Sequence, residues 1–270
     1  MSGTWPLACA LLGVVALQWL GSTAADAAEA CLDEAILVEA SGIADPRTVA
    51  LADGRSLRLA GIEPIALLVT EMARAETALQ DRLSALAGSG RALHVRILSA
   101  EPDRYGRLPA LIAVGDALLQ ETLLREGLAV AFPTGEPLPC FDRLLAAEGE
   151  ARRDRRGFWT EVTIPQAGSD ALRERISRFV IFEGLLISVG NRRARSYLNF
   201  GPRWSTDTTV EIDARHREAF GGEAGLAGLA GHRLRLRGFL EEKGGPMLVV
   251  TSPMQIEVLE NAAPSSGIAP

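Results

Sequence analysis

The stretch that decides the fold is residues 103–132, DRYGRLPALIAVGDALLQETLLREGLAVAF. It opens with the polar turn at 103–107, continues as an apolar run at 108–114 and then passes into leucines at helical spacing. Gly127 follows this last segment and ends it, because glycine readily adopts the left-handed backbone that closes a helix. The stretch therefore predicts a turn, a strand at 108–114 and a helix at 117–127.

The sequence on either side supplies the rest of one domain. In chain order these patterns are a strand at 34–40, a hairpin at 47–61 that turns at Asp53-Gly54, a helix at 71–86, a strand at 92–98 and, beyond residue 127, a helix at 139–159 that ends at Gly157. The first helix follows from the spacing of Met72, Leu79, Leu83 and Leu86. Five strands, with one helix between the third and fourth and two after the fifth, predict an OB-type barrel with three helices.

A second β-rich region follows a polar segment. Its strand patterns lie at 179–190, 195–201, 208–214, 232–242 and 246–260. Five short strands with glycine turns predict a second small β-barrel or OB-like domain, so the fold class is mainly β with helices (α+β). The expected organisation is a first domain at 31–162, a linker at 163–178, a second domain at 179–260 and a disordered tail at 261–270.

Residues 1–30 are typical of a signal peptide. The apolar run at 7–20 is too short to span a bilayer comfortably, and the small residues after it suit cleavage near Ala27 or Ala30. An uncleaved anchor is the alternative, since no Lys or Arg precedes the apolar run. We expect an exported protein, periplasmic or secreted, with no transmembrane span in the mature chain.

Export gives two cysteines of the mature chain, Cys31 and Cys140, an oxidising environment. Two cysteines permit one pairing, and a bridge closing so long a loop could stabilise the fold by about 4 kcal/mol. The other interpretation is two unrelated buried thiols. The pair is therefore a candidate disulfide.

The charge balance limits the kinds of partner. Lys and Arg total 28 against 34 Asp and Glu, a formal net charge of −6, and 47% of the residues are hydrophobic. A globular, acidic chain does not coat DNA through bulk electrostatics, which requires a basic domain. Any site for a polyanion has to be local.

Several spaced motifs point to one family. A D-x-Y-G-R turn at 103–107 precedes a strand, R-E-G-L-A stands at 125–129, and A-E-x-x-A-R and R-G-F-W follow at 147–152 and 156–159. Upstream, DPRTVALADGRSLRLAGIEP at 45–64 matches an opening D-G-D-T-V and a loop L-x-G-I-D-x-P-E. Together these motifs resemble the thermonuclease family, the staphylococcal-nuclease-like domain, over roughly residues 34–160. The resemblance implies a five-stranded OB barrel with three helices.

The resemblance also implies metal-dependent phosphodiester hydrolysis. In the family, carboxylates hold calcium, two arginines neutralise charge in the transition state and a glutamate activates water. By position, the two arginines are Arg58 and Arg107, which makes them the candidate catalytic residues. Tyr105 corresponds to a tyrosine that lies beside bound nucleotide.

The acidic residues of the motif are changed. Arg47 stands where the first calcium aspartate is expected, Glu63 replaces the second, and Ala66 takes the place of the base, or Ile65 if the loop is shifted by one. We therefore expect no metal and no other cofactor, with calcium the cofactor only if hydrolysis is retained.

Two interpretations of the arginines stay open. Arg47, Arg58 and Arg107 could form a phosphate-sized pocket in which Arg47 stands in for the calcium, with Tyr105 beside the ligand. Alternatively, Arg58 and Arg107 hold the barrel together through ion pairs with neighbours such as Glu63 or Asp103.

A second group of cations and aromatic residues lies in the second region. Its members are Arg192, Arg193, Arg195, Tyr197, Phe200 and Trp204. Such a composition is typical of a surface that stacks single-stranded nucleic acid. A solvated arginine turn beside ordinary core aromatics is the interpretation that the acidic chain favours.

These observations favour an exported thermonuclease-like protein, catalytically impaired or inactive, that binds a phosphate-bearing or envelope partner. Nucleic acid is one candidate ligand. The alternatives are an active calcium-dependent nuclease and a protein-interaction scaffold whose protein partner the sequence does not identify.

Overall fold

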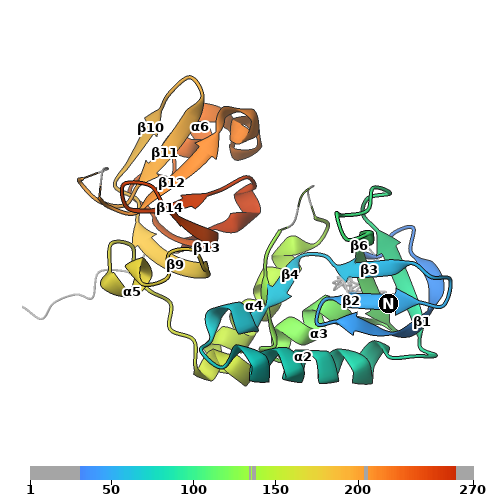
Figure 1. Cartoon of the computed structure of the whole chain (residues 1–270). Helices are drawn as coiled ribbons and strands as arrows, with labels where there is room; N and C mark the ends of the chain where they lie inside the picture. Colours follow the sequence, from blue (N-terminus) through green and yellow to red (C-terminus); the bar gives the residue numbers. More distant parts are fainter. Residues whose placement is uncertain (1–30, 134, 136–137, 204–205, 260–270) are drawn as a thin grey trace, which may run out of the picture.

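The computed structural model describes residues 31–133, 135, 138–203 and 206–259. The expected signal peptide at 1–30 and tail at 261–270 lie outside these residues, as does Trp204. Figure 1 shows two lobes, one built from β1 to α4 and the other from β9 to β15. Each lobe has its own apolar core, so the two lobes are described in turn.

Within the described residues, the first lobe contains eight strands and five helical segments. In chain order its elements are β1 (Ile36–Asp45), β2 (Thr48–Leu51), β3 (Ser56–Leu59), β4 (Ile62–Pro64), η1 (Ile65–Leu68), α2 (Met72–Ala87), β5 (Ala92–Ile97), β6 (Arg107–Val114), β7 (Ala117–Leu118), α3 (Leu119–Arg125), β8 (Ala129–Ala131), α4 (Phe141–Arg153) and η2 (Gly157–Thr160).

Five of these strands form the first barrel. β1 is antiparallel to β2 and β5, β2 is antiparallel to β3, β5 is antiparallel to β6, and β3 closes the ring by running parallel to β6. The third strand parallel to the fifth is the connectivity of an OB barrel. The α+β fold predicted for this part is confirmed. The loop expected after Gly61 instead contains the short strand β4, because Ile62–Pro64 pairs with β8.

Helix α2 covers one end of this barrel (Figure 1). Its buried side chains are Ala75, Leu79, Leu83 and Ala87, spaced four residues apart, so they form one stripe that faces the core. The predicted stripe was partly wrong: Met72 is 52% exposed, and Leu86 is only partly buried. The alanines were missed because they contribute little hydrophobic area.

Two glycines from separate motifs contact each other, one in the turn after α3 and the other in the turn after α4. Gly127 and Gly157 both have positive φ angles, 68° and 51°. A Cβ at Gly157 would lie 2.3 Å from the carbonyl oxygen of Glu126, and one at Gly127 would lie 2.2 Å from that of Arg156. The predicted helix at 139–159 ends earlier, at Arg153, because the chain must turn to bring Gly157 against Gly127.

The second lobe contains a further set of short elements. They are α5 (Asp170–Arg173), β9 (Phe179–Leu185), β10 (Ser188–Asn191), β11 (Arg195–Asn199), β12 (Thr209–Asp213), η3 (Ala214–Phe220), α6 (Gly222–Ala227), β13 (Arg233–Glu242), β14 (Pro246–Val249), η4 (Pro253–Gln255) and β15 (Ile256–Leu259). Among the described residues, no helix combines the length and apolarity needed to cross a bilayer.

The second lobe repeats the connectivity of the first. β9 is antiparallel to β13, β10 to β11, β11 to β12 and β13 to β14, while β12 runs parallel to β14. With β9 and β10 as one bent first strand, this is again a barrel whose third strand is parallel to its fifth. The five predicted strand regions divide into seven strands, because β9 and β10 pair with different partners and η4 interrupts the last region.

The segment at 163–178, expected to be a linker, packs against the second barrel. Leu172 of α5 is fully buried in the second core, and Glu183 of β9 bonds both Pro165 and Ala167 through its backbone. The connection between the barrels is therefore held in place along much of its length.

An apolar cluster joins the two barrels. Ile65 and Ala66 of η1 and Val130 of β8 pack in one buried cluster with Phe179 and Ile181 of β9. The first residues of the second barrel therefore complete a core that the first barrel leaves open.

A buried ion pair crosses the same boundary. Arg237 of β13 is fully buried and donates to Glu148 of α4 at 2.8 and 3.2 Å, to the carbonyl oxygen of Ala131 at 2.6 Å, and to Glu257. Burial alone would lower the pKa of Arg237, but the charges of Glu148 and Glu257 overcome this effect and raise the pKa. Glu148 belongs to the A-E-x-x-A-R motif, so this motif contacts the second barrel.

Candidate functional site

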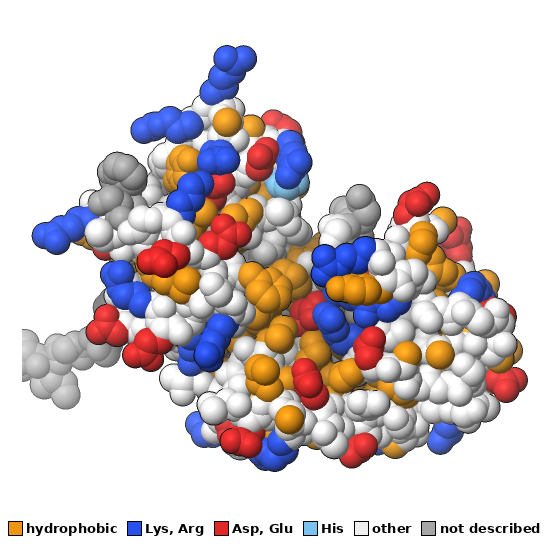
Figure 2. All heavy atoms as spheres, viewed as in Figure 1, with side chains coloured by type: hydrophobic (Ala, Val, Ile, Leu, Met, Phe, Trp, Pro, Cys, Tyr) orange, Lys and Arg blue, Asp and Glu red, His pale blue; other side chains and the backbone are white. Residues whose placement is uncertain are grey.

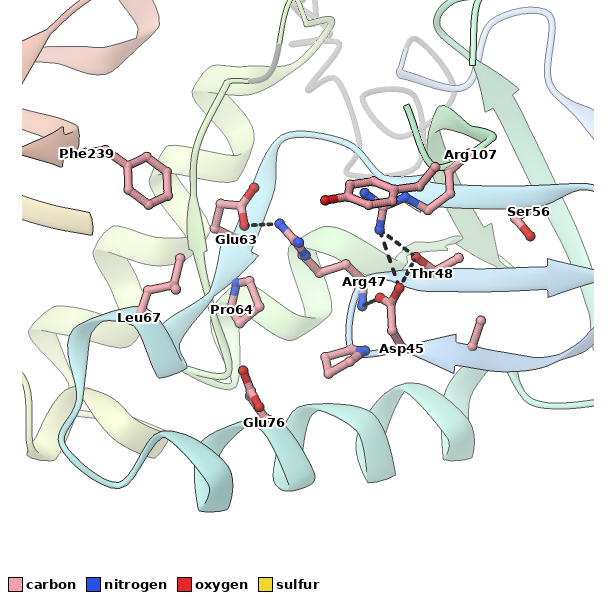
Figure 3. Close-up of a pocket in the computed structure, with 13 residues that line it drawn as sticks. Asp45, Arg47, Thr48, Ser56, Glu63, Pro64, Leu67, Glu76, Arg107 and Phe239 are labelled. Atoms are coloured by element: carbon pink, nitrogen blue, oxygen red, sulfur yellow. Dashed lines mark hydrogen bonds and ion pairs between the residues drawn. The ribbon is translucent and has the colours of Figure 1, made fainter. Parts of the chain in front are cut away.

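A cleft of about 630 Å³ lies where the first barrel faces the second. Figure 2 shows hydrophobic side chains gathered between the two lobes, next to a group of basic side chains on the first. Figure 3 shows Phe239 of β13 across from Glu63 and Leu67. The polar part of the wall comes from Asp45, Arg47, Thr48, Ser56, Glu63, Glu76, Tyr105 and Arg107. The strand ends and turns of the first barrel therefore face the aromatic ring of Phe239, which belongs to the second barrel.

Arg47 and Arg58 both bind the carboxylate of Glu63. Arg47 bonds one oxygen, and Nη2 of Arg58 lies 2.5 Å from the other. Thr48 and Arg58 are register partners on β2 and β3, so the hairpin brings the two arginines to β4. The side chain of Arg58 is 15% exposed, against 32% for Arg47, and Arg58 does not line the cleft. Burial lowers the pKa of Arg58, and the charge of Glu63 opposes that effect.

Arg107 is held by two aspartates. Its Nε and Nη2 lie 2.9 and 2.8 Å from Oδ2 of Asp103, and its Nη1 lies 3.4 Å from Asp45 and 3.2 Å from the hydroxyl of Thr48. Burial would raise the pKa of Asp103, but the bonds from Arg107 and from backbone N–H groups lower it to about 2. Tyr105 is 66% exposed, and the centroid of its ring lies 5.0 Å from the Arg107 guanidinium.

The position that the motif assigns to the base does not face the cleft. Ala66 is 1% exposed and belongs to the apolar cluster between the barrels, and Ile65 is equally buried there. Leu67, the next residue of η1, lines the cleft instead. The short helix η1 thus directs the side chain of Ala66, the position aligned with the catalytic base, into the apolar cluster and away from the cleft.

The residues of the cleft do not fit a calcium ion. Both oxygens of Glu63 are bound by guanidinium groups, and Arg47 brings a positive charge to the place of a ligand carboxylate. Within the part of the chain that the structure describes, no group of three or more His, Cys, Asp or Glu residues could hold a metal.

Cys31 and Cys140 form a disulfide, with their Cα atoms 5.7 Å apart. The bridge ties the segment before β1 to the residue before α4. It lies in the first barrel and takes no part in the cleft, whose wall is formed by other residues.

Residues 82–161 match the family model of the staphylococcal nuclease homologues. The part of the first barrel from residue 82 onward is therefore similar to the domain of this nuclease-related family. The match includes Tyr105, Arg107 and the two contacting glycines, and it begins after Arg47, Arg58 and Glu63. No curated protein matches the chain.

The structure brings together most of the residues that the sequence singled out. Arg47, Tyr105 and Arg107 share the cleft, and Arg58 joins it indirectly through Glu63. The sequence did not identify Leu67 or Phe239 as part of the site. Leu67 has the appearance of an ordinary apolar residue, and Phe239 reaches the cleft only through the packing of the two barrels, so no local pattern could have revealed either.

Proposed function

We propose that the chain is an exported, catalytically silent relative of the nucleases that binds a phosphate ester in the cleft between its barrels. The observation that carries this proposal is the Arg47–Glu63–Arg58 cluster, in which a guanidinium bonds the carboxylate that would otherwise hold calcium. Nucleic acid is the ligand class that the family match favours.

Two features of the cleft support the proposed lack of hydrolysis: it has no general base at the aligned position, and its carboxylates do not form a metal site. No carboxylate occupies the aligned base position, because Ala66 stands there and is buried. Loss of a general base alone lowers a rate by about 10²- to 10⁴-fold. The pairing of Glu63 with two guanidinium groups also leaves the cleft without a ligand set for a Lewis acid.

Binding is supported by the groups that face the cleft. Arg47 is partly exposed and donates one of its side-chain N–H groups to Glu63, so other donors remain for a phosphate. Asp45, Glu63 and Asp103 already compensate much of the positive charge, so we expect a weak complex, on the order of millimolar. The exposed rings of Tyr105 and Phe239 suit a ligand with an aromatic base.

Export is part of the proposal. The Cys31–Cys140 bridge supports it, because disulfides persist in oxidising compartments. We propose a periplasmic or secreted location for the mature protein.

A nuclease assay tests the silent site. The mature chain is incubated with single- and double-stranded DNA, with and without millimolar calcium. We expect no calcium-dependent cleavage above a preparation that carries Arg107→Gln. Turnover that requires calcium and disappears in this variant would establish an active nuclease instead.

Titration with a nucleoside 5′-monophosphate, followed by backbone NMR, tests the binding. We expect shifts at Arg47, Tyr105 and Arg107, and weaker binding in Arg107→Gln. Arg55→Gln is the matched control, because Arg55 pairs with Asp53 on the β2–β3 turn and does not line the cleft. Shifts that are absent, or equal in both variants, would refute a phosphate site here.

A further inference from the structure

The outer face of the second barrel carries a groove of about 470 Å³. It lies over β11, β12 and β14, between the β10–β11 turn and the β13–β14 turn. In Figure 1 these strands occupy the part of the second lobe that is remote from β1 to β3. The groove is therefore separate from the cleft between the barrels.

Strand alternation explains which side chains reach the groove. On β11, Ser196 and Leu198 are fully buried, whereas Tyr197 and Asn199 point to the opposite face. On β12, Thr209 and Glu211 line the same face and are the register partners of Asn199 and Tyr197. One aromatic ring thus lies among polar groups at the centre of the groove.

The two flanking turns add positive charge. Arg192 comes from the β10–β11 turn and Lys243 from the β13–β14 turn, and both are exposed and line the groove. Glu211 bonds Lys243 at 3.1 Å and Arg195 at 3.0 Å, and its side chain is largely buried. Its single charge is therefore shared by two cations, and Arg192, whose Nη1 donates to the carbonyl oxygen of Asn191 at 3.1 Å, lines the same groove as Tyr197. Figure 2 shows basic side chains projecting from this lobe.

The six residues Arg192, Arg193, Arg195, Tyr197, Phe200 and Trp204 of the sequence pattern do not act as one group. Phe200 is a core residue, 8% exposed, whose ring packs against Phe182 at 5.7 Å. Tyr197 and Arg192 lie in the groove, and the fold adds Lys243, which is distant in sequence. The folding of the barrel, and not the sequence pattern alone, therefore brings Tyr197 into one groove with Arg192 and Lys243.

We propose that this groove binds single-stranded nucleic acid, with a base stacked on Tyr197 and neighbouring phosphates on Arg192 and Lys243. A ring between cations suits this ligand, because unpaired bases present their faces while the backbone presents its charge. In a duplex the base faces are stacked on each other, so the ring of Tyr197 has no partner there. The groove has the size of a small-ligand pocket and fits a nucleotide or two.

Fluorescence anisotropy of a labelled single-stranded oligonucleotide of about ten nucleotides tests this proposal. We expect Tyr197→Ala to weaken binding about 10-fold and Tyr197→Phe to keep it, since phenylalanine retains the stacking face. The double variant Arg192→Gln/Lys243→Gln should lower the slope of log affinity against log salt by about 1.4. Arg173→Gln, an exposed arginine on α5, is the matched control.

Competition and a second variant set separate this site from the first. Unlabelled duplex DNA and the anionic polysaccharide heparin should compete less well than the single strand at equal charge. Arg47→Gln/Arg107→Gln, which alters the first cleft, should leave most of the affinity intact. Equal competition by heparin, loss of binding only in the first-cleft variant, no effect of Tyr197→Ala, or no binding by the unaltered chain would each overturn the proposal. The monophosphate titration reports on the first cleft independently.

Discussion

Arg47 illustrates how one residue sets the chemistry of the cleft. Its guanidinium bonds Glu63, while the backbone N–H of Arg47 donates to Asp45 at 2.7 Å. Replacing this side chain by a carboxylate would remove a positive charge and leave three acidic groups, at 45, 47 and 63, near one another. Oxygen ligands of this kind are what calcium prefers.

We therefore predict that Arg47→Asp gains a calcium site. Differential scanning calorimetry should show a Tm that rises with millimolar calcium in the variant and stays constant in the parent. Magnesium serves as the comparison ion, since its demand for octahedral geometry makes it a poorer match. An equal response of both proteins to calcium would contradict the prediction.

The buried position of Ala66 gives a second residue-scale prediction. Ala66→Glu would place a carboxylate in the apolar cluster between the barrels, whereas Leu67→Glu would place it in the open cleft. We expect Ala66→Glu to lower the free energy of unfolding by several kcal/mol, roughly the cost of burying an unpaired polar group, and Leu67→Glu to cost far less. Urea denaturation of both variants would show whether the order is reversed.

The Asp103 carboxylate provides a pH-dependent prediction. Its pKa in the folded chain is about 2, below the ordinary 3.8, so its contribution to stability is complete above pH 3.8. That contribution is lost as the pH falls through about 2. Carboxyl-selective NMR should place the midpoint of Asp103 near 2, and Arg107→Gln should raise it. A midpoint at or above 3.8 in the unaltered chain would be inconsistent with the bonds to Arg107.

At the scale of elements, the contact between Gly127 and Gly157 fixes how the turn after α3 meets the turn after α4. The N–H of Phe158 donates to the carbonyl of Gly127 at 3.2 Å, so the two backbones touch where a side chain would separate them. The motifs R-E-G-L-A and R-G-F-W each supply one of these glycines. Each motif therefore supplies one glycine of a close backbone contact between the turn after α3 and the turn after α4.

We predict that Gly157→Ala lowers the free energy of unfolding by about 2 kcal/mol or more, because it adds a clash to an unfavourable backbone angle. Gly54→Ala is the control, since Gly54 also has a positive φ, 87°, but nothing lies within 4 Å of its added Cβ. Chemical denaturation should show a clearly smaller loss for Gly54→Ala. Equal losses would mean that backbone strain alone accounts for the effect.

The elements also show what the sequence could predict. Five strands and the helix α2 follow from apolar periodicity and glycine turns, because these signals are local. The buried stripe of α2 was harder to predict, since Ala75 and Ala87 carry little hydrophobic signal. β4 was missed because its three residues form a strand only by pairing with β8, far along the chain. Likewise, Phe239 enters the cleft only through the docking of the barrels.

At the scale of the whole molecule, Arg237 and Glu148 make the two barrels depend on each other. Each group is buried and receives its partner from the other barrel. Removing one partner leaves the other charge buried without full compensation, which typically costs about 3–5 kcal/mol. Phe239 follows Arg237 by two residues on β13, so we expect a change in the docking of the barrels to move Phe239 relative to the cleft.

We predict that Arg237→Met lowers the free energy of unfolding by about this amount and weakens ligand binding in the cleft without altering Arg47 or Arg107. The double variant Arg237→Met/Glu148→Gln should cost less than the sum of the two single changes, since it removes both members of the pair. Arg233→Met, on the same strand but with a side chain that is 43% exposed, is the control. Additive losses would show that the two residues do not act together.

The Cys31–Cys140 bridge closes the first barrel into a covalent ring that contains every strand from β1 to β8. A protease that cuts a loop inside this ring leaves one molecule, heavier by a single water, and the fragments separate on a gel only after reduction. Helix α4 and the second barrel lie outside the ring, so a cut at 163–178 yields two pieces without reductant once the chain is denatured. Fragments that separate only after reduction come from cuts between Cys31 and Cys140, whereas fragments that separate without reductant come from cuts outside this span. Comparing reduced and non-reduced digests would therefore show on which side of the bridge each accessible loop lies.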